Sequence, residues 1–203
     1  MKLYLVTDRS LAATRAIEDV VAAAVRGGVT AVQLREKECG TREFVDLALR
    51  LKSVLTVPLI INDRVDVALA AGADGVHVGQ SDMDVRDVRR LLGPRAIVGL
   101  SVETPQQAED AADLPVDYLG VGPIFATPTK TDAAPAWGLG QLAALRARTH
   151  RQLIAIGGIH AGNARQIIEA GADGIAVVSA ICAASDPEAA ARQLCHEIHN
   201  WAH

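Results

Sequence analysis

The sequence predicts a single compact (β/α)8 TIM barrel over residues 1–203, and three observations carry the prediction. Short apolar runs that end in polar or glycine residues recur along the chain, as is typical of buried parallel strands. Helical patterns lie between those runs. A glycine-containing junction between helix and strand occurs three times, at residues 26–32, 71–78 and 170–177. The alternative is an open doubly wound sheet, but no Gly-x-Gly-x-x-Gly turn follows the first apolar run.

The expected elements alternate from the first strand to the last helix. The strands are Tyr4–Val6, Ala31–Val32, Leu59–Ile61, Val76–Val78, Ala96–Leu100, Tyr118–Phe125, Ile154–Ile156 and Ile175–Val178. The helices are Ala16–Arg26, Arg42–Leu55, Val65–Ala70, Val85–Leu92, Pro105–Ala112, Leu139–Ala147, Ala164–Glu169 and Pro187–Trp201. Several follow an N-cap residue or open with proline, as at Thr41, Asp84, Thr104–Pro105 and Asp186–Pro187. In a barrel all the strands end at one rim, where such proteins carry their chemistry.

Composition narrows the class of protein. Half of the residues are apolar but only 3% are aromatic, so Ala, Val, Leu and Ile are expected to fill the core. The net charge of −4 argues against nucleic acid or an anionic membrane as the main partner. The cysteines, Cys39, Cys182 and Cys195, are odd in number and lack Cys-x-x-Cys spacing, which indicates reduced thiols in a cytoplasm. No long apolar stretch or cleavage signal predicts secretion or a membrane span. The expected partners are small molecules, and a homo-oligomer is compatible with the sequence.

Two aspartates follow neighbouring strands. Asp63 comes directly after the third strand and Asp82 lies just beyond the fourth, so a barrel brings them together at the rim. Two carboxylates with room for water and substrate oxygens are typical of a Mg2+ site beside a phosphate ester. Alone, Asp63 is equally suited to capping the helix that starts near Arg64, and Asp82 to a turn. The pairing favours the metal.

Cationic residues follow the second and sixth strands. Alternation along an extended chain places Gln33, Arg35 and Lys37 on one side, which is suited to binding phosphate oxygens if it faces the barrel mouth. In isolation, these charges are better explained as a solvated loop. The segment Thr127–Lys130 places two hydroxyls beside the cation of Lys130. The loop 127–141 is long enough to close as a lid.

Glycine and small polar residues end the last two strands. Ile156–Ile159 contains Gly157 and Gly158, and Val177–Ala180 contains Val178 and Ser179. Barrels often bind a phosphate here through backbone amides and a short helix, and a Cβ would block the anion.

Several other residues suggest a function, but each also has a purely structural explanation. Asn62, Gln80 and Ser101 are suited to a heteroaromatic ring, although each alone is more often a satisfied rim residue. His77 is expected to be a hydrogen-bonded histidine of the core or lumen. His196 and His199 have helical spacing but no third ligand, which favours a surface over zinc. Cys39 is near the predicted site, with no base nearby in sequence.

Five segments, taken together and in order, resemble the thiamine phosphate synthases over almost the whole chain. They are Gln33–Lys37, Asn62–Ala68, Gly75–Asp82, Gly122–Lys130 and Ala155–Ile159. The resemblance implies an enzyme that joins 4-amino-2-methyl-5-(diphosphooxymethyl)pyrimidine to 4-methyl-5-(2-phosphooxyethyl)thiazole, or its carboxylated tautomer, and releases diphosphate. It implies Mg2+ as the cofactor.

The resemblance also implies a role for each matching residue. It assigns Mg2+ to Asp63 and Asp82, the diphosphate to Arg35, Lys37, Asn62 and Lys130, the pyrimidine to Gln33 and Ser101, and the thiazole phosphate to Thr127, Thr129, Gly158, Val178 and Ser179. The residues expected to be catalytic are Arg35, Lys37, Lys130 and Ser101. They would act by stabilising the departing diphosphate and orienting the pyrimidine, without a protein nucleophile.

One position departs from the family pattern. Glu103 stands where many relatives carry histidine, and the related thiazole tautomerases use that histidine and lack the metal acids. Having both aspartates and Lys130 without the histidine indicates the synthase, and leaves open whether Glu103 does more than cap the next helix. A non-catalytic phosphate-binding barrel is a further alternative, but it would not need the aspartates.

Overall fold

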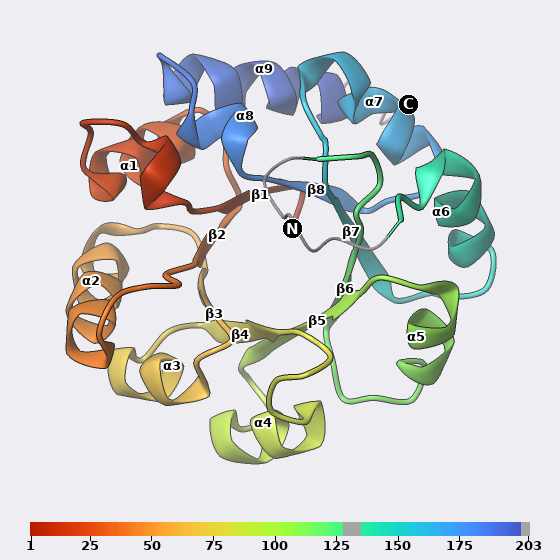
Figure 1. Cartoon of the computed structure of the whole chain (residues 1–203), viewed down its shortest axis with the longest axis horizontal. Helices are drawn as coiled ribbons and strands as arrows, with labels where there is room; N and C mark the ends of the chain where they lie inside the picture. Colours follow the sequence, from red (N-terminus) through yellow and green to blue (C-terminus); the bar gives the residue numbers. More distant parts are fainter. Residues whose placement is uncertain (128–134, 200–203) are drawn as a thin grey trace.

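A computed structural model describes residues 1–127 and 135–199 as a closed barrel of parallel strands, each hydrogen-bonded to the next, with β8 returning to β1 (Figure 1). The strands are β1 Leu3–Val6, β2 Ala31–Leu34, β3 Leu59–Asn62, β4 Gly75–Val78, β5 Ile97–Val102, β6 Tyr118–Val121, β7 Gln152–Ile156 and β8 Gly174–Val177. Helices surround the barrel (Figure 1). The predicted (β/α)8 fold is therefore confirmed.

The helices alternate with the strands, and two short ones were not predicted. The main helices are α1 Ile17–Arg26, α2 Thr41–Val54, α3 Val65–Ala71, α4 Val85–Leu92, α5 Pro105–Asp110, α6 Gly138–Arg146, α7 Ala161–Glu169 and α9 Pro187–His199. The unpredicted pair are the 3-10 helix η1, Arg9–Leu11, and α8, Ser179–Cys182. No helix in the described ranges is long and apolar enough to cross a membrane.

Several predicted boundaries differ from the structure by one or two residues, and two differ by more. β6 ends at Val121 and not at Phe125, because Gly122 is followed by Pro123, which has no amide hydrogen to extend the ladder. α7 begins three residues before Ala164, because His160 and Asn163 form a reciprocal capping box at its start. The prediction for β6 was therefore too long because it relied on apolar residues alone. The prediction for α7 was too short because the capping box was not recognised.

The core has two parts. Aliphatic residues fill the shell between strands and helices, as the composition predicts. The lumen differs, since Tyr4 and Tyr118, the chain's two tyrosines, are buried there with Ile60 and Ile154. Gly99 makes room for them: a Cβ at this position would lie 2.2 Å from the Tyr118 ring. The lumen is therefore aromatic and polar as well as aliphatic.

One hydrogen bond recurs at the amino ends of the strands. The residue just before each even-numbered strand accepts, through its side chain, the backbone N–H of the preceding odd-numbered strand. The pairs are Thr30 with Leu3 at 3.1 Å, Asp74 with Leu59 at 2.8 Å, Asp117 with Val98 at 2.7 Å and Asp173 with Leu153 at 2.8 Å. The junction seen three times in the sequence therefore has a fourth copy at Asp117, which lacks the glycine.

We expect Asp173→Ala to destabilise the fold markedly. Asp173 accepts the Leu153 amide and also pairs with Arg146 at 2.8 Å, so alanine leaves both donors without this acceptor. Losing such a partner costs about 1–3 kcal/mol, which lowers the melting temperature by several degrees in a chain of this size. Thermal unfolding beside Asp113→Ala, a change at an exposed aspartate, measures the effect. Equal melting temperatures for the two variants would contradict it.

Candidate active site

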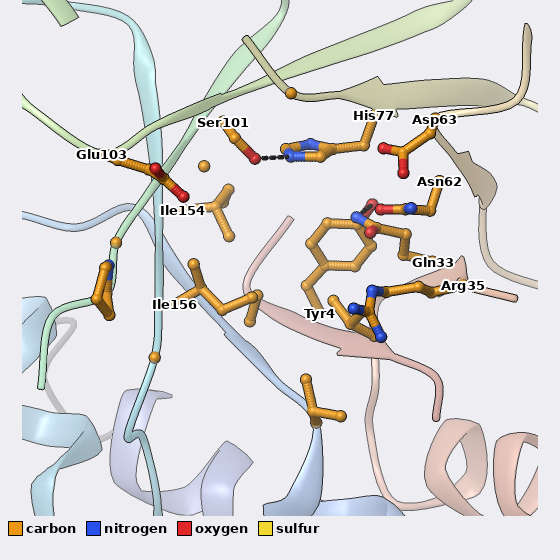
Figure 2. A pocket seen from close by; sticks show the side chains of 18 of the residues that line it. Tyr4, Gln33, Arg35, Asn62, Asp63, His77, Ser101, Glu103, Ile154 and Ile156 are labelled. Atoms are coloured by element: carbon orange, nitrogen blue, oxygen red, sulfur yellow. Dashed lines mark hydrogen bonds between the residues drawn. The ribbon is translucent and has the colours of Figure 1, made fainter. Parts of the chain in front are cut away.

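A pocket of about 650 Å³ opens at the carboxyl ends of the strands (Figure 2). All the strands contribute to its walls, so it lies on the barrel axis. Gln33, Arg35 and Asn62 line one side, and Glu103 and Ile154 lie across from them (Figure 2). Its volume is in the range of small-molecule sites.

Most of the residues predicted for the site line this one pocket. They are Gln33, Arg35, Lys37, Asn62, Asp63, Asp82, Ser101, Thr127, Gly158, Val178 and Ser179, together with Gln80. Thr129, Lys130 and the rest of residues 128–134 of the predicted lid lie outside the described residues. The rule that strand ends carry the site therefore placed these side chains together, while their individual roles stay predictions.

In the cationic segment after β2, Glu36 lies between Arg35 and Lys37 and anchors the segment away from the pocket. Arg35 and Lys37 line the pocket. Glu36 does not, and its side chain is only 7% exposed, with a carboxylate oxygen 3.0 Å from Nε of Arg9. The Arg35 amide also donates to the hydroxyl of Thr7 at 3.0 Å. The predicted alternation is thus correct. Glu36 is not freely solvated, whereas Lys37 is exposed at the pocket.

Asp63 has a backbone conformation that few side chains adopt. Its φ is +62°, in the left-handed region, and its amide donates to the His77 carbonyl at 2.8 Å. The residue at the N-cap position of α3 is Arg64, and no side-chain hydrogen bond caps this helix. Asp63 therefore faces the pocket without acting as a helix cap. Such strained residues are common at functional sites.

Asp82 combines both of its predicted roles. Its Oδ2 accepts the Gly79 amide at 2.6 Å, which closes the turn after β4, and its side chain lines the pocket. Asp82 is also close enough to Asp63 to raise its pKa. Burial first, and then the charge of Asp82, raises the pKa of Asp63 to about 6, against a smaller opposing effect of Arg35.

The two aspartates form an incomplete metal-ligand set. Across the described residues, no group of three or more His, Cys, Asp or Glu side chains is arranged to hold a metal ion by itself. Mg2+ is commonly bound by one or two protein carboxylates, with water and substrate phosphates completing its coordination. The excess negative charge of the Asp63–Asp82 pair fits such an ion.

We expect Asp63→Asn to stabilise the metal-free protein at pH 7.5. The folded state raises the pKa of Asp63 from 3.8 to about 6, so it binds the proton more tightly than the unfolded chain does. The ionised carboxyl therefore opposes folding above pH 6 and has no such effect below pH 3.8. After screening by solvent at this accessible group, the gain is roughly 1 kcal/mol, or about 2–4 °C in melting temperature.

The measurement is thermal unfolding with a chelator at several pH values, beside Asp113→Asn at an exposed position. Asparagine also tolerates the left-handed backbone, which keeps the comparison electrostatic. A gain of the same size at pH 3.5 and pH 7.5 would show that charge is not its source.

His77 lies in the lumen and lines the pocket. Its Nδ1 is 2.9 Å from the Tyr118 hydroxyl, and its Nε2 is 2.8 Å from the Ser101 hydroxyl. Burial lowers the pKa of His77 to about 4, so the ring is neutral at pH 7. The prediction of a hydrogen-bonded lumen histidine is confirmed, but its link to Ser101 was not foreseen.

The expected phosphate cradle has the required backbone. Gly158 has φ +66°, and a Cβ there would lie 2.8 Å from that of Phe125. Packing and conformation therefore both require glycine at this position, and its role toward a phosphate stays a prediction. Val178 precedes the short helix α8 and Ser179 begins it, and both line the pocket.

Glu103 is a pocket residue and not the cap of α5. The cap is Thr104, whose hydroxyl accepts the Gln107 amide at 3.2 Å. The backbone of Glu103 donates to Gln107 Oε1 at 2.7 Å, and its side chain lines the pocket (Figure 2). Its place one residue beyond β5 could have indicated a rim position.

Cys39 lies outside the described pocket lining and packs partly buried against the outer core. Burial raises the pKa of its thiol, which opposes formation of the reactive thiolate. These observations agree with the expectation that Cys39 is not a nucleophile.

A closed barrel with cations, a carboxylate pair and glycine turns at its carboxyl rim has the features of a barrel enzyme for anionic ligands. The family model "Thiamine monophosphate synthase" matches residues 3–181. The chain is 61% identical over 197 residues to a thiamine-phosphate synthase of Albidiferax ferrireducens, covering 96% of this chain and 90% of the relative. It is 53% identical over 195 residues to one of Syntrophomonas wolfei, covering 95% and 93%.

The solved structures include a similar barrel. A thiamine phosphate pyrophosphorylase from Pyrococcus furiosus superposes with a TM-score of 0.88 at 36% identity, covering 98% of this chain and 96% of that one. The chain therefore belongs to the thiamine monophosphate synthase family, and it is a transferase of that family.

Proposed function

We propose that the chain joins 4-amino-2-methyl-5-(diphosphooxymethyl)pyrimidine to 4-methyl-5-(2-phosphooxyethyl)thiazole, or its carboxylated tautomer, to give thiamine phosphate and diphosphate. With the carboxylated thiazole, carbon dioxide is released as well. One observation carries the proposal within this family: Arg35 and Lys37 line the same pocket as the Asp63–Asp82 pair. A metal-bridging acid pair beside cations suits a diphosphate leaving group. The glycine turn at Gly158 suits the second, smaller phosphate.

Asp63 and Asp82 would hold the proposed Mg2+, which supplies charge neutralisation to the diphosphate oxygens when bound. Arg35 provides forked donors to phosphate, and Lys37 provides a mobile point charge. Asn62 supplies a neutral donor beside them at the end of β3. From the sequence, we assign Lys130 to the same group. Preorganised charge of this kind favours departure of an anion without reorganisation of solvent.

The proposed reaction needs no covalent bond to the protein. The bond between the pyrimidine methylene carbon and the bridging oxygen breaks, and its electron pair leaves with diphosphate. The thiazole nitrogen lone pair then forms the new carbon–nitrogen bond, giving a thiazolium product. The protein positions the two rings, with Gln33 and Ser101 on the pyrimidine and the turn at Gly158 with Val178 and Ser179 on the thiazole phosphate.

The acid pair also separates the alternatives. A thiazole tautomerase needs a proton-transfer group, and Glu103 stands where the expected histidine is missing. Neither a tautomerase nor a passive phosphate-binding barrel would need a second carboxylate at Asp82, whose charge contributes to the raised pKa of Asp63. These features favour the synthase.

The test is to incubate the full chain with both substrates and Mg2+ and to measure thiamine phosphate and diphosphate. The two products should form in equal amounts and only when both substrates are present. Conversion of the carboxylated thiazole alone, without thiamine phosphate in the complete mixture, would indicate a tautomerase and overturn the proposal. No change in either substrate would indicate a binding protein.

A further inference from the structure

A continuous series of side-chain hydrogen bonds crosses the lumen, between residues that line the pocket. Gln33 Nε2 donates to the Tyr4 hydroxyl at 3.0 Å, and the Tyr4 and Tyr118 hydroxyls are 3.0 Å apart. The Tyr118 hydroxyl is 2.9 Å from Nδ1 of His77, and Nε2 of His77 is 2.8 Å from the Ser101 hydroxyl. Figure 2 shows the Ser101–His77 bond and the Tyr4 ring beside Gln33.

All five residues line the pocket, but the two end residues, Gln33 and Ser101, each keep a hydrogen-bonding group that the bonds within the series do not use. Gln33 comes from β2 and Ser101 from β5, on different sides of the barrel. Between them, Tyr4 and Tyr118 are 1% and 0% exposed, and His77 is 8% exposed. The three inner residues therefore have to satisfy one another, because a buried donor without an acceptor costs about 1–3 kcal/mol.

Each inner residue has one hydrogen to give along the chain. A tyrosine hydroxyl carries one hydrogen, and a neutral imidazole carries one on either nitrogen. Because Gln33 donates to Tyr4, Tyr4 donates to Tyr118 and Tyr118 donates to Nδ1 of His77. The histidine hydrogen is then on Nε2 and is donated to Ser101. The direction of the first bond thus fixes that of the last.

The direction decides what the two ends present to the pocket. In the sense just described, Gln33 presents its carbonyl oxygen as an acceptor, and Ser101 keeps its hydroxyl hydrogen as a donor. In the opposite sense, Gln33 would present only N–H donors and Ser101 would present lone pairs. Neither end can change its character without reversal of every bond between them.

We propose that Tyr4, Tyr118 and His77 are positioning residues that couple the two ends, so that the pocket presents an acceptor at Gln33 together with a donor at Ser101. The ligand class this pair selects is a heteroaromatic ring with an amino donor and a ring-nitrogen acceptor. A 4-oxo ring offers the opposite pattern and leaves polar groups unpaired, which sites of this kind reject strongly. The identity of the ring depends on the proposed function, but the coupling does not.

The test reads the position of the His77 hydrogen in the substrate-free chain by nitrogen-15 NMR. A ring nitrogen that carries hydrogen resonates far from one that does not, and His77→Gln identifies the signals. In the wild type at pH 8, hydrogen is expected on Nε2. Hydrogen on Nδ1 in the wild type would overturn the proposed sense, and this measurement needs no variant of the chain.

Gln33→Glu tests the coupling at a distance. Beside Arg35, the introduced carboxylate is ionised at pH 8 and can only accept, so Tyr4 must donate to it and every later bond reverses. The expected result is transfer of the His77 hydrogen from Nε2 to Nδ1, three hydrogen bonds away. In a Tyr4→Phe background the chain is cut, and adding Gln33→Glu should leave the His77 signals unchanged.

An unchanged tautomer in Gln33→Glu, or the same change in the Tyr4→Phe background, would overturn the proposal. A merely structural role for the inner residues predicts no such directed transfer. The tautomer measurement is independent of turnover. If the hydrogen bonds reverse in Gln33→Glu but the wild-type protein makes no thiamine phosphate, only the proposed function is rejected. If the wild-type protein makes thiamine phosphate but the His77 tautomer does not change in Gln33→Glu, only the coupling is rejected.

Discussion

Asp63→Asn and Asp82→Asn are each expected to lower turnover by at least ~100-fold, equivalent to about 2.7 kcal/mol of transition-state stabilisation. Diphosphate gains negative charge as its bond to carbon breaks, and each carboxylate would contribute to holding the Mg2+ that neutralises it. Asparagine keeps the shape of the side chain and, at position 63, tolerates the φ of +62°. The loss should therefore come from charge and not from unfolding.

The assay measures initial rates of thiamine phosphate formation across Mg2+ concentrations, with Asp113→Asn as an exposed control expected to match the wild type. A chelator should abolish wild-type turnover, and added Mg2+ should restore it. Full activity in the Asp63→Asn, Asp82→Asn double variant would reject the metal assignment. If Asp63→Asn both stabilises the metal-free protein and lowers turnover, Asp63 is a residue that serves activity at a cost in stability.

The position of the site was predictable because strand ends in a parallel barrel share one rim. Asp63, Asp82 and Arg35 are distant in sequence, but each follows an apolar run, and the fold alone brings such residues to one pocket. Alternation beyond β2 also placed Arg35 and Lys37 on the pocket side. No contact energies were needed, only the topology and the two-residue period of an extended chain.

The lumen network was not predictable in the same way. Tyr4 and Tyr118 are separated by 114 positions, and each looks like an ordinary apolar strand residue. Their hydroxyls lie 3.0 Å apart because both side chains enter the same lumen cluster, and because Gly99 leaves space beside the Tyr118 ring. That register depends on how every strand is staggered, which local patterns do not encode.

Boundaries failed for local reasons. The apolar run after Tyr118 continues past Val121, but Pro123 cannot donate a ladder hydrogen bond. The reciprocal bonds of His160 and Asn163 start α7 early, and histidine is not a usual N-cap residue. The missing signals were therefore the hydrogen-bonding capacities of single residues, while the pattern of strands and helices was read correctly.

An electron-withdrawing substituent on the pyrimidine ring is expected to slow the chemical step by at least ~100-fold, or about 2.7 kcal/mol, while substrate binding changes little. If diphosphate leaves before the thiazole attacks, positive charge builds on the methylene carbon and must be delocalised into the aminopyrimidine. The pocket offers an apolar wall at Ile154 and Ile156 and no described thiolate at that place, so the ring itself must carry this charge. The effect should therefore be in turnover, because it acts on the transition state.

Single-turnover rates for a series of ring-substituted substrates, with dissociation constants measured separately, distinguish this course from direct displacement. Cys39→Ser should leave the rate nearly unchanged, because the thiol lies outside the described lining and burial raises its pKa away from the reactive form. Intact-protein mass measurement during turnover should detect no added pyrimidine. A flat response to ring substituents would indicate that thiazole attack and diphosphate departure are concerted. A pyrimidine adduct on Cys39 would instead indicate covalent catalysis and contradict both the stepwise and the concerted mechanism. A steep response without an adduct would leave charge stabilisation by the rim, and not a protein nucleophile, as the source of the rate.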